Sequence, residues 1–266
     1  MSVTVERNGP VTTVIHSRPE ARNAMDVESA EALVEAFLAF ERDPDAAVAV
    51  FWGAGGAFCA GWDLKLAASL AGQAEPLKAL DFPEDGRPAP RGPMGPSRLE
   101  LSKPVIAAVA GPAVAGGFEL ALWCDLRVME EDAYFGVYCR RWGIPLIDGG
   151  TVRLPRIVGQ GRALDIILTG RKVTAEEAYR IGLADRVAPK FKAREVAEEV
   201  AQEIARFPQE CVRADRRSVH LQHGLPVAEA LRREWENSVH VLEREGVAGA
   251  ARFSSGKGRG GDFGAI

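Results

Sequence analysis

Cysteine is scarce in this sequence of 266 residues, and its spacing excludes two kinds of cross-linked fold. The four cysteines are Cys59, Cys124, Cys139 and Cys211. No two of them form a CxxC pair, so the sequence predicts neither a disulfide framework nor a zinc site. Unpaired cysteines are typical of a reducing compartment, and we therefore expect a cytoplasmic protein.

Histidine is equally rare, and nucleotide-binding fingerprints are missing. His220 and His223 stand three residues apart, but no carboxylate or cysteine follows at a matching spacing, so we expect no metal. The stretch "GAGGAF" lacks the third glycine of a dinucleotide fingerprint. We expect no cofactor.

A strong excess of either charge is also missing, since 33 basic residues face 37 acidic ones and the formal net charge is −4. Without a basic domain, nucleic acid is not a predicted partner. The N-terminus lacks the basic and apolar regions of a signal peptide. Val105 to Trp123 is almost uncharged, but Gly111-Pro112, Gly116-Gly117 and Glu119 interrupt it. We therefore predict a buried segment there and no membrane span.

What the sequence does contain is a pattern of short apolar strands and glycine turns. Predicted elements are a hairpin of Val3–Val5 and Val11–His16 around Asn8-Gly9, a helix capped by Asp26, and strands at Ala46–Trp52, Val105–Ala110 and Leu126–Met129. Strand, glycine turn and helix follow one another at least twice, which predicts an α/β core of β-β-α units. Ala74 to Ser97 holds six prolines and three glycines, so we expect a long surface loop or lid.

From about Thr151 the pattern is mostly helical. Thr174 and Glu177 have the spacing of a capping box. Amphipathic helices are predicted at Glu195–Ala205, Cys211–Leu221 and Val227–Leu242, followed by a glycine-rich, loop-like tail from Arg252. The sequence leaves open whether this part is a lobe on the core or a surface for oligomerisation.

Glu119 is the residue whose surroundings call for an explanation, because it is a carboxylate amid apolar residues. Gly116 would begin its helix and direct an N–H outward, with the helix dipole behind it, toward a developing oxyanion. A second N–H from the Ala60-Gly61 turn would complete the hole. Glu119, one helical turn on, could then move a proton beside a carbonyl. The alternative is that Glu119 only complements the helix dipole.

Five motifs in order resemble the crotonase, or enoyl-CoA hydratase/isomerase, superfamily. They are "RPEARNAM" from Arg18, "AFCAGWDLK" from Ala57, "KPVIAAVAGPAVAGGFELALWCDLRV" from Lys103, "TVRLPRIVGQGRALDIILTGRKVTAEEAYRIGLADRV" from Thr151 and "RFSSGKGRGGDF" from Arg252. The resemblance implies a spiral of repeated β-β-α units over residues 1–200 and a C-terminal helical trimerisation region over residues 201–266. It also implies an acyl-CoA substrate and a homotrimer or hexamer. From the interrupted uncharged segment we expect no membrane partner.

Carried over by position, the resemblance also assigns the site. Ala60 and Gly116 would supply the oxyanion-hole N–H groups, and Glu119 would be the first catalytic glutamate. The residues lining the CoA side would be Arg22, Asn23, Ala24, Asp63 and Leu64. Trp62, beside the hole, either narrows the acyl pocket or belongs to the core.

One position departs from the family pattern. Hydratases of the family use a second glutamate 20 residues after the first, and here that position is Cys139. A thiol is a weak acceptor with an unperturbed pKa of about 8.5, so it does not replace a carboxylate that orients water. The next acid is Asp148, which we expect to be the second functional carboxylate; alternatively it caps the following helix. The expected activity is hydration or double-bond isomerisation of an enoyl-CoA, the alternative being an impaired CoA-thioester-binding protein.

Overall fold

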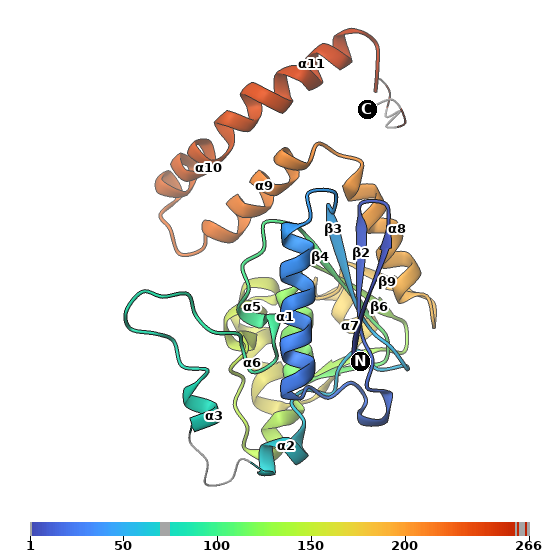
Figure 1. Cartoon of the computed structure of the whole chain (residues 1–266), viewed down its shortest axis with the longest axis vertical. Coiled ribbons are helices and arrows are strands. Elements are labelled where there is room, and N and C mark those ends of the chain that lie inside the picture. Colours follow the sequence, from blue (N-terminus) through green and yellow to red (C-terminus); the bar gives the residue numbers. More distant parts are fainter. Residues whose placement is uncertain (1, 70–74, 259, 261–263, 265–266) are drawn as a thin grey trace.

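A computed structural model of the chain describes residues 2–69, 75–258, 260 and 264. Its centre is a six-stranded sheet in the order β1-β2-β3-β4-β6-β9 (Figure 1). The strands are β1 Val3–Asn8, β2 Val11–His16, β3 Val48–Gly53, β4 Val105–Val109, β6 Leu126–Glu130 and β9 Arg186–Ala188. β1 and β2 form the predicted antiparallel hairpin, and every later neighbour pairs in parallel.

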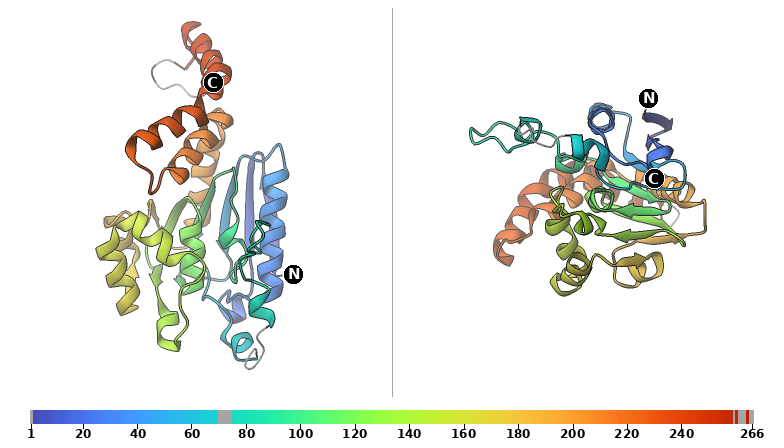
Figure 2. Two further views of the ribbon diagram at one scale, coloured as in Figure 1. Left: turned by 90° about the vertical axis from the view of Figure 1, so that its left-hand side faces the viewer. Right: turned by 90° about the horizontal axis from the view of Figure 1, so that it is seen from below.

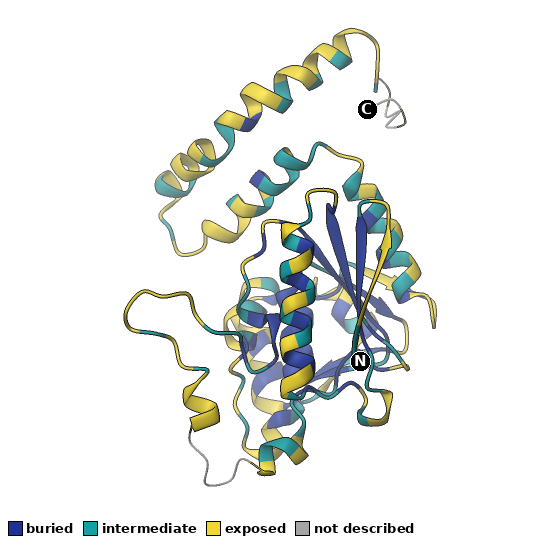
Figure 3. Cartoon of the chain, in the orientation of Figure 1, coloured by how far each residue is buried: buried dark blue, intermediate teal, exposed yellow. Residues whose placement is uncertain are grey.

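The alternation of side chains along β3 divides the interior into two layers. Ala49 and Phe51 contribute to one hydrophobic cluster, while Val48 and Val50 contribute to another. Both faces are therefore buried, as expected for a parallel sheet, and the strand reads as a continuous apolar run (Figure 3).

Two helices cover the opposite faces of this sheet. α1 (Val27–Arg42) packs on β1 and β2, and its predicted N-cap is confirmed by the Ser29 N–H, which donates to Asp26 Oδ1 at 2.8 Å. α8 (Ala193–Ala205) covers the other face through Ala193, Ala197 and Ala201. The predicted boundary between the core and the C-terminal region, at residue 200, falls within α8.

A second sheet and a buried helix complete the strand-turn-helix pattern. The sheet joins β5 (Pro112–Val114), β7 (Tyr134–Gly136) and β8 (Lys172–Thr174) in the order β5-β7-β8. α4 (Gly116–Trp123) follows β5 directly, and all eight of its residues are buried. Glu119 is therefore a carboxylate inside a helix that is apolar all round.

Short helical elements connect these strands and helices along the chain. They are η1 Pro19–Ala21, α2 Leu64–Ser69, α3 Glu75–Lys78, η2 Pro96–Arg98, η3 Tyr138–Trp142, α5 Gly150–Val158, α6 Gln160–Thr169 and α7 Ala175–Arg180. Thr174 caps α7 by accepting from the Glu177 N–H at 3.3 Å. The capping box is wrong, however, because the Glu177 carboxylate binds Arg171 at 2.7 and 2.8 Å.

The expected surface loop at Ala74–Ser97 is only half correct. Ala74 lies outside the described residues, and most of residues 75–90 is exposed. Residues 92 and 94–97 are buried instead, because this segment turns inward against α4.

Beyond α8 the chain forms helices that lie past one end of the sheet rather than on either face (Figures 1 and 2). α9 (Gln209–Leu221) is held to the core by Asp125, which accepts from Arg216 Nε at 2.9 Å and contacts His220 Nε2 at 2.9 Å. α10 (Val227–Val241) continues through a π-helical turn, Leu242–Gly246, into α11 (Val247–Ser254). The predicted loop from Arg252 is therefore wrong for its first three residues, which are helical.

Much of the apolar surface of this C-terminal segment is uncovered. Exposed side chains along α10, the π-helical turn and α11 are Val227, Leu231, Trp235, Leu242, Val247 and Phe253. In the described ranges, no helix has both the length and the apolar character needed to cross a membrane. The uncharged run from Val105 to Trp123 is β4, β5 and α4.

Candidate active site

A cavity of about 80 Å³ opens at the N-terminus of α4. It is lined by Ala60, Trp62, Leu64, Pro93, Met94, Ala115, Gly116, Glu119, Tyr138, Cys139, Trp142, Ile144, Pro145, Ile147 and Asp148. The structure thus brings five of the predicted residues to one cavity: Ala60, Leu64, Gly116, Glu119 and Asp148.

The turn into α4 is strained. Ala115 has φ 53° and ψ −126°, a region that residues with a Cβ rarely adopt. Its N–H donates to Gly136 O at 2.8 Å, which holds the turn on β7. Gly61 packs directly against this turn, since a Cβ built on it would lie 2.8 Å from the Ala115 Cβ and 3.1 Å from the Gly116 nitrogen. The two glycine turns therefore meet at the start of α4.

The Ala60 N–H is not the free donor that we expected. It donates to Arg22 O at 3.1 Å, so it is already used within the protein. Trp62 forms a parallel bridge with Met25, in which the Met25 N–H donates to Gly61 O and the Asp63 N–H donates to Met25 O. The Trp62 N–H therefore points away from Met25. Among the described residues neither this N–H nor that of Gly116 has an acceptor.

From the sequence we assign a role to the side chain of Trp62 and none to its backbone N–H. That side chain is half-buried, packs against the main hydrophobic cluster and also lines the cavity. The signal that points to Trp62 is the glycine before it. In an extended segment the N–H groups of residues 60 and 62 point the same way, and only a turn at the residue between them directs them to different sides. Gly61, with φ 93°, makes that turn.

The Glu119 side chain is only 2% exposed, and backbone N–H groups partly offset the cost of burying its charge. Its Oε1 accepts from the Asp148 N–H at 2.9 Å and from the Gly150 N–H at 2.8 Å. Oε2 has no hydrogen bond from the described residues, and the side chain lines the cavity. Burial is the main cause that raises the pKa of Glu119 to about 7, with the Asp148 carboxylate adding to it. Near neutral pH this side chain can both take and give a proton.

Asp148 ties the inward-turned segment to the Glu119 site. Its Oδ1 accepts from the Met94 N–H at 3.0 Å and from the Ser97 hydroxyl. The capping interpretation is wrong, because the N-cap of α5 is Gly149 and no side chain caps that helix. Burial raises the pKa of Asp148, and its Oδ2 has no hydrogen bond from the rest of the described chain.

Arg153 and Ser97 are site residues that sequence reasoning missed. Arg153 Nη1 donates to Asp148 O at 2.9 Å, and Nη2 donates to Ser97 O at 2.7 Å. Gly92 is needed beside them, since a Cβ there would lie 2.5 Å from Asp148 Oδ1. Nothing in their spacing signals this, because residues 92–97 and 148–153 meet only in the folded chain.

Cys139, on η3, lines the cavity close to Glu119. Burial raises the pKa of its thiol, and the Glu119 carboxylate raises it further. The rest of that wall is apolar and aromatic: Tyr138, Trp142, Ile144 and Ile147. Trp142 and Ile147 are 67% and 50% exposed, so they form the outer rim.

The expected CoA-side residues divide into buried supports and surface groups. Asn23 is 0% exposed, and its side chain accepts from Arg18 N at 2.7 Å and donates to Ala54 O and Ala57 O. Asn23 therefore holds two loops together and cannot line a ligand, which corrects the prediction. Arg22 is exposed and Ala24 half-exposed.

The other two CoA-side candidates stand at the start of α2. Leu64 is 43% exposed and lines the cavity. The Asp63 carboxylate accepts from Lys65 N at 3.0 Å and pairs with Arg18 Nη2 at 3.3 Å. Arg18 also pairs with Asp26 at 3.2 Å, so it is the centre of this loop cluster.

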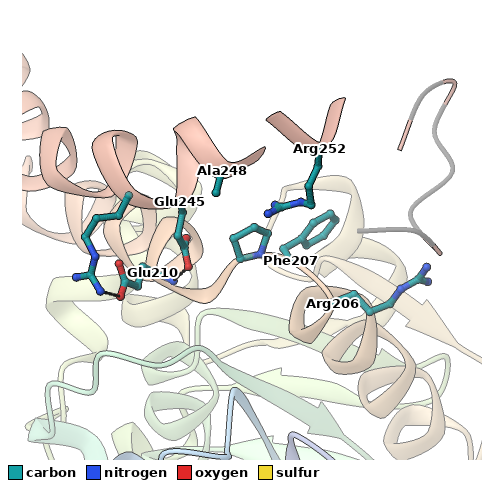
Figure 4. A pocket seen from close by; sticks show the side chains of 8 residues that line it. Arg206, Phe207, Glu210, Glu245, Ala248 and Arg252 are labelled. Atoms are coloured by element: carbon teal, nitrogen blue, oxygen red, sulfur yellow. Dashed lines mark hydrogen bonds and ion pairs between the residues drawn. The ribbon is translucent and has the colours of Figure 1, made fainter. Parts of the chain in front are cut away.

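A larger cavity of about 470 Å³ lies between the α8–α9 junction and the C-terminal helices (Figure 4). Arg206, Arg244 and Arg252 contribute to its lining. Glu245 caps α9 there by accepting from Cys211 N at 2.8 Å. No described group of histidine, cysteine or carboxylate side chains is arranged to hold a metal ion. The combination of a strained turn, free N–H groups and a buried acid with a raised pKa occurs at the α4 cavity, which we take as the candidate active site.

Known proteins resemble this chain along nearly its whole length. A family model described as enoyl-CoA hydratase/isomerase matches residues 6–254. Enoyl-CoA hydratase EchA19 of Mycobacterium tuberculosis is 37% identical over 245 residues, covering 90% of this chain and 87% of that protein. A carnitinyl-CoA dehydratase of Salmonella typhi is 38% identical over 233 residues, covering 87% and 85%.

Solved structures agree. The crystal structure of enoyl-CoA hydratase from Mycobacterium tuberculosis H37Rv superposes with a TM-score of 0.84 at 30% identity, covering 96% of each chain. That of enoyl-CoA hydratase EchA1 from Mycobacterium marinum gives a TM-score of 0.85 at 30% identity with the same coverage.

Proposed function

The chain belongs to the enoyl-CoA hydratase/isomerase family and has the crotonase fold, and from this premise we propose that it converts enoyl-CoA thioesters through an enolate, with Glu119 as the acid/base. The observation that carries the proposal is the Glu119 carboxylate. It is 2% exposed, has a pKa raised to about 7, and lines the same cavity as Gly116.

The thioester oxygen would bind the N–H groups of Gly116 and Trp62. Support comes from their having no acceptor among the described residues, and from the contact of the two turns that carry them. The α4 dipole adds positive potential at Gly116. A donor of this kind typically lowers an activation barrier by about 3 kcal/mol. In this proposal the second oxyanion-hole donor is the N–H of Trp62 and not that of Ala60, which the sequence predicts.

Glu119 would transfer the proton. Two N–H groups fix Oε1, which leaves Oε2 for the substrate. A base whose pKa lies near the working pH is the most effective proton shuttle. Isomerisation of a 3-enoyl to a 2-enoyl thioester needs one such group, which takes a proton from one carbon and returns it to another. This is the reaction that the site supports best, because Cys139 stands where a second glutamate would be.

Hydration is the second candidate, and one observation favours it. Asp148 Oδ2 has no described partner while Oδ1 is tied to Met94 and Ser97, so the side chain is oriented and one oxygen remains for water. We therefore retain Asp148 as the second functional carboxylate, for hydration only.

Three further parts of the proposal follow from the same surfaces. The CoA moiety would bind along Arg22, Ala24, Asp63 and Leu64, with Asn23 as a support. The exposed apolar side chains of α10 and α11 support a homotrimer or hexamer. Four free cysteines are compatible with a cytoplasmic enzyme. The CoA thioester would be its substrate, with no further cofactor.

The experiment that tests the function is a turnover assay with crotonyl-CoA and a 3-enoyl-CoA, monitored by thioester absorbance. We expect conversion of the 3-enoyl substrate to be the faster reaction. Calorimetry with butyryl-CoA and with butyrate should detect binding of the thioester only. Binding without turnover of either substrate would instead support a CoA-thioester-binding protein.

A further inference from the structure

Cys139 differs from the other cysteines in its surroundings. Cys59 and Cys124 are 0% and 3% exposed and face the interior, while Cys211 is exposed on α9. Cys139 is the one cysteine of the four that lines the active-site cavity, where it is 7% exposed. The proton transfer described above gives this thiol no role.

A second feature of the cavity faces the same space. Glu119 is 98% buried, its Oε1 is held by two N–H groups, and its Oε2 has no described partner. Glu119 is also near enough to Cys139 to affect the titration of the thiol. A nucleophile and a base therefore share one small cavity with Gly116 and Trp62, the two residues whose N–H groups have no described acceptor.

We propose that Cys139 is a nucleophile that adds to the β-carbon of an unhindered 2-enoyl thioester in this cavity and traps the protein as a thioether. The proposal rests on the proposed function, since the cavity must first bind an acyl-CoA. Its ligand class is an α,β-unsaturated thioester with an unsubstituted β-carbon, because the acyl chain and the sulfur must share a cavity of only about 80 Å³.

The step balances without an oxidant or reductant. The sulfur–carbon bond forms at the β-carbon while the carbon–carbon π bond breaks, and its electron pair moves to the thioester oxygen. The N–H groups of Gly116 and Trp62 stabilise that enolate. The proton passes from sulfur to Glu119 Oε2 and then to the α-carbon, so one S–H is consumed and one C–H is formed.

The surroundings make this reaction selective. Burial and the Glu119 charge keep the thiol protonated at neutral pH, so a general alkylating reagent attacks it slowly. A bound enoyl thioester instead meets the sulfur at a high effective concentration, with a base beside it. Cys211 has the opposite character, being exposed and remote from the cavity.

The test uses acryloyl-CoA, which has an unsubstituted β-carbon, with intact mass and peptide mapping. We expect one acryloyl-CoA adduct on Cys139, slowed at least tenfold by saturating propionyl-CoA. Cys139→Ser should lose the adduct, and the control Cys211→Ser should keep it. Iodoacetamide should label Cys211 in preference to Cys139. Glu119→Gln should slow adduct formation by about 10²-fold, the usual effect of losing a general base.

An adduct on Cys211 alone, or a rate unchanged in Glu119→Gln, would overturn the proposal. Calorimetry with propionyl-CoA distinguishes a failure of this inference from a failure of the proposed function. If propionyl-CoA binds but acryloyl-CoA leaves Cys139 unmodified, this inference fails and the proposed function stands. If propionyl-CoA does not bind, the proposed function fails, and this inference with it.

Discussion

At the scale of single residues, the site depends on a carboxylate that is costly to bury. Glu119 offsets part of this cost with the N–H groups of Asp148 and Gly150. What remains appears as a pKa raised to about 7 from 4.5, so the folded protein holds a proton that the unfolded chain releases. Catalytic groups are often tuned in this way, and the tuning has a measurable effect on stability.

The first prediction concerns stability against pH. The raised pKa means that the folded protein favours the protonated form of Glu119. The contribution of this group to the free energy of unfolding is therefore complete below pH 4.5 and is lost as the pH rises to about 7. Glu119→Gln cannot titrate, so it should gain stability relative to the wild type over that interval, by about 1.4 kcal/mol for each pKa unit. Urea unfolding of both proteins at pH 5 and pH 8 measures this. A stability difference that is the same at both pH values would contradict the assignment.

The second prediction concerns the strained turn. Ala115 has φ 53° and ψ −126°, which glycine adopts without strain. Ala115→Gly should therefore stabilise the protein by about 1 kcal/mol, after the loss of backbone entropy is subtracted from the relief of strain. Thermal unfolding measures the change. The matched control is Ala113→Gly on β5, a residue without positive φ, which should destabilise. Equal destabilisation of both variants would show that the turn is not strained.

At the scale of elements, α4 and two loops form the cavity wall. α4 supplies Gly116 and Glu119, and residues 92–97 supply Met94. The N–H groups that hold Glu119 come from Asp148, before α5, and from Gly150 at its start. Asp148 connects the two loops. Substitutions of Asp148 can therefore distinguish its structural role, which is to connect these loops, from a role in catalysis.

The third prediction is that Asp148→Asn affects hydration and spares isomerisation. Asparagine can still accept from Met94 N and Ser97 Oγ, so the melting temperature should stay near that of the wild type. Hydration of crotonyl-CoA should fall by about 10²-fold because the carboxylate is lost. Conversion of a 3-enoyl-CoA should change less than about tenfold, since Glu119 remains. Ser97→Ala, which removes the hydroxyl contact alone, is the control. Equal loss of both activities would make Asp148 part of the common step.

The sequence predicted these elements unevenly, for physical reasons. The hairpin, the cap at Asp26 and the buried strands follow from local pattern, and all are confirmed. The predictions that Ala60 is an oxyanion-hole donor and that Asn23 lines the CoA side are wrong, because both residues bond to segments far along the chain. The Glu177 carboxylate likewise binds Arg171 instead of completing the capping box with Thr174, because an ion pair with arginine is the stronger interaction.

At the scale of the whole molecule, the C-terminal helices stand past the end of the sheet. Asp125 holds α9, but α10 and α11 leave Leu231, Trp235 and Val247 largely exposed. An apolar surface of this kind favours association with another copy of the chain. The sequence left open whether this part is a lobe on the core or a surface for oligomerisation, and it is the part of the fold whose apolar side chains stay exposed in the single chain.

The fourth prediction is that Trp235→Asp yields monomers while α10 remains helical. A charge in place of an exposed aromatic side chain should disfavour a packed interface and change little within the monomer. Sedimentation velocity with circular dichroism measures both properties. Glu234→Lys, a charge change on the same turn, is the control and should keep the oligomer. If the wild type itself sediments as a monomer, the association is refuted.

The role of Glu119 as the acid/base is tested most directly by Glu119→Gln, with turnover of a 3-enoyl-CoA and affinity for butyryl-CoA measured on one preparation. The amide is nearly isosteric with the carboxyl group and can still accept from the two N–H groups, so butyryl-CoA should bind as in the wild type. It cannot carry the proton, so turnover should fall by about 10²-fold or more. Wild-type turnover in the variant would show that Glu119 is a structural residue at the start of α4 and would contradict its role in proton transfer.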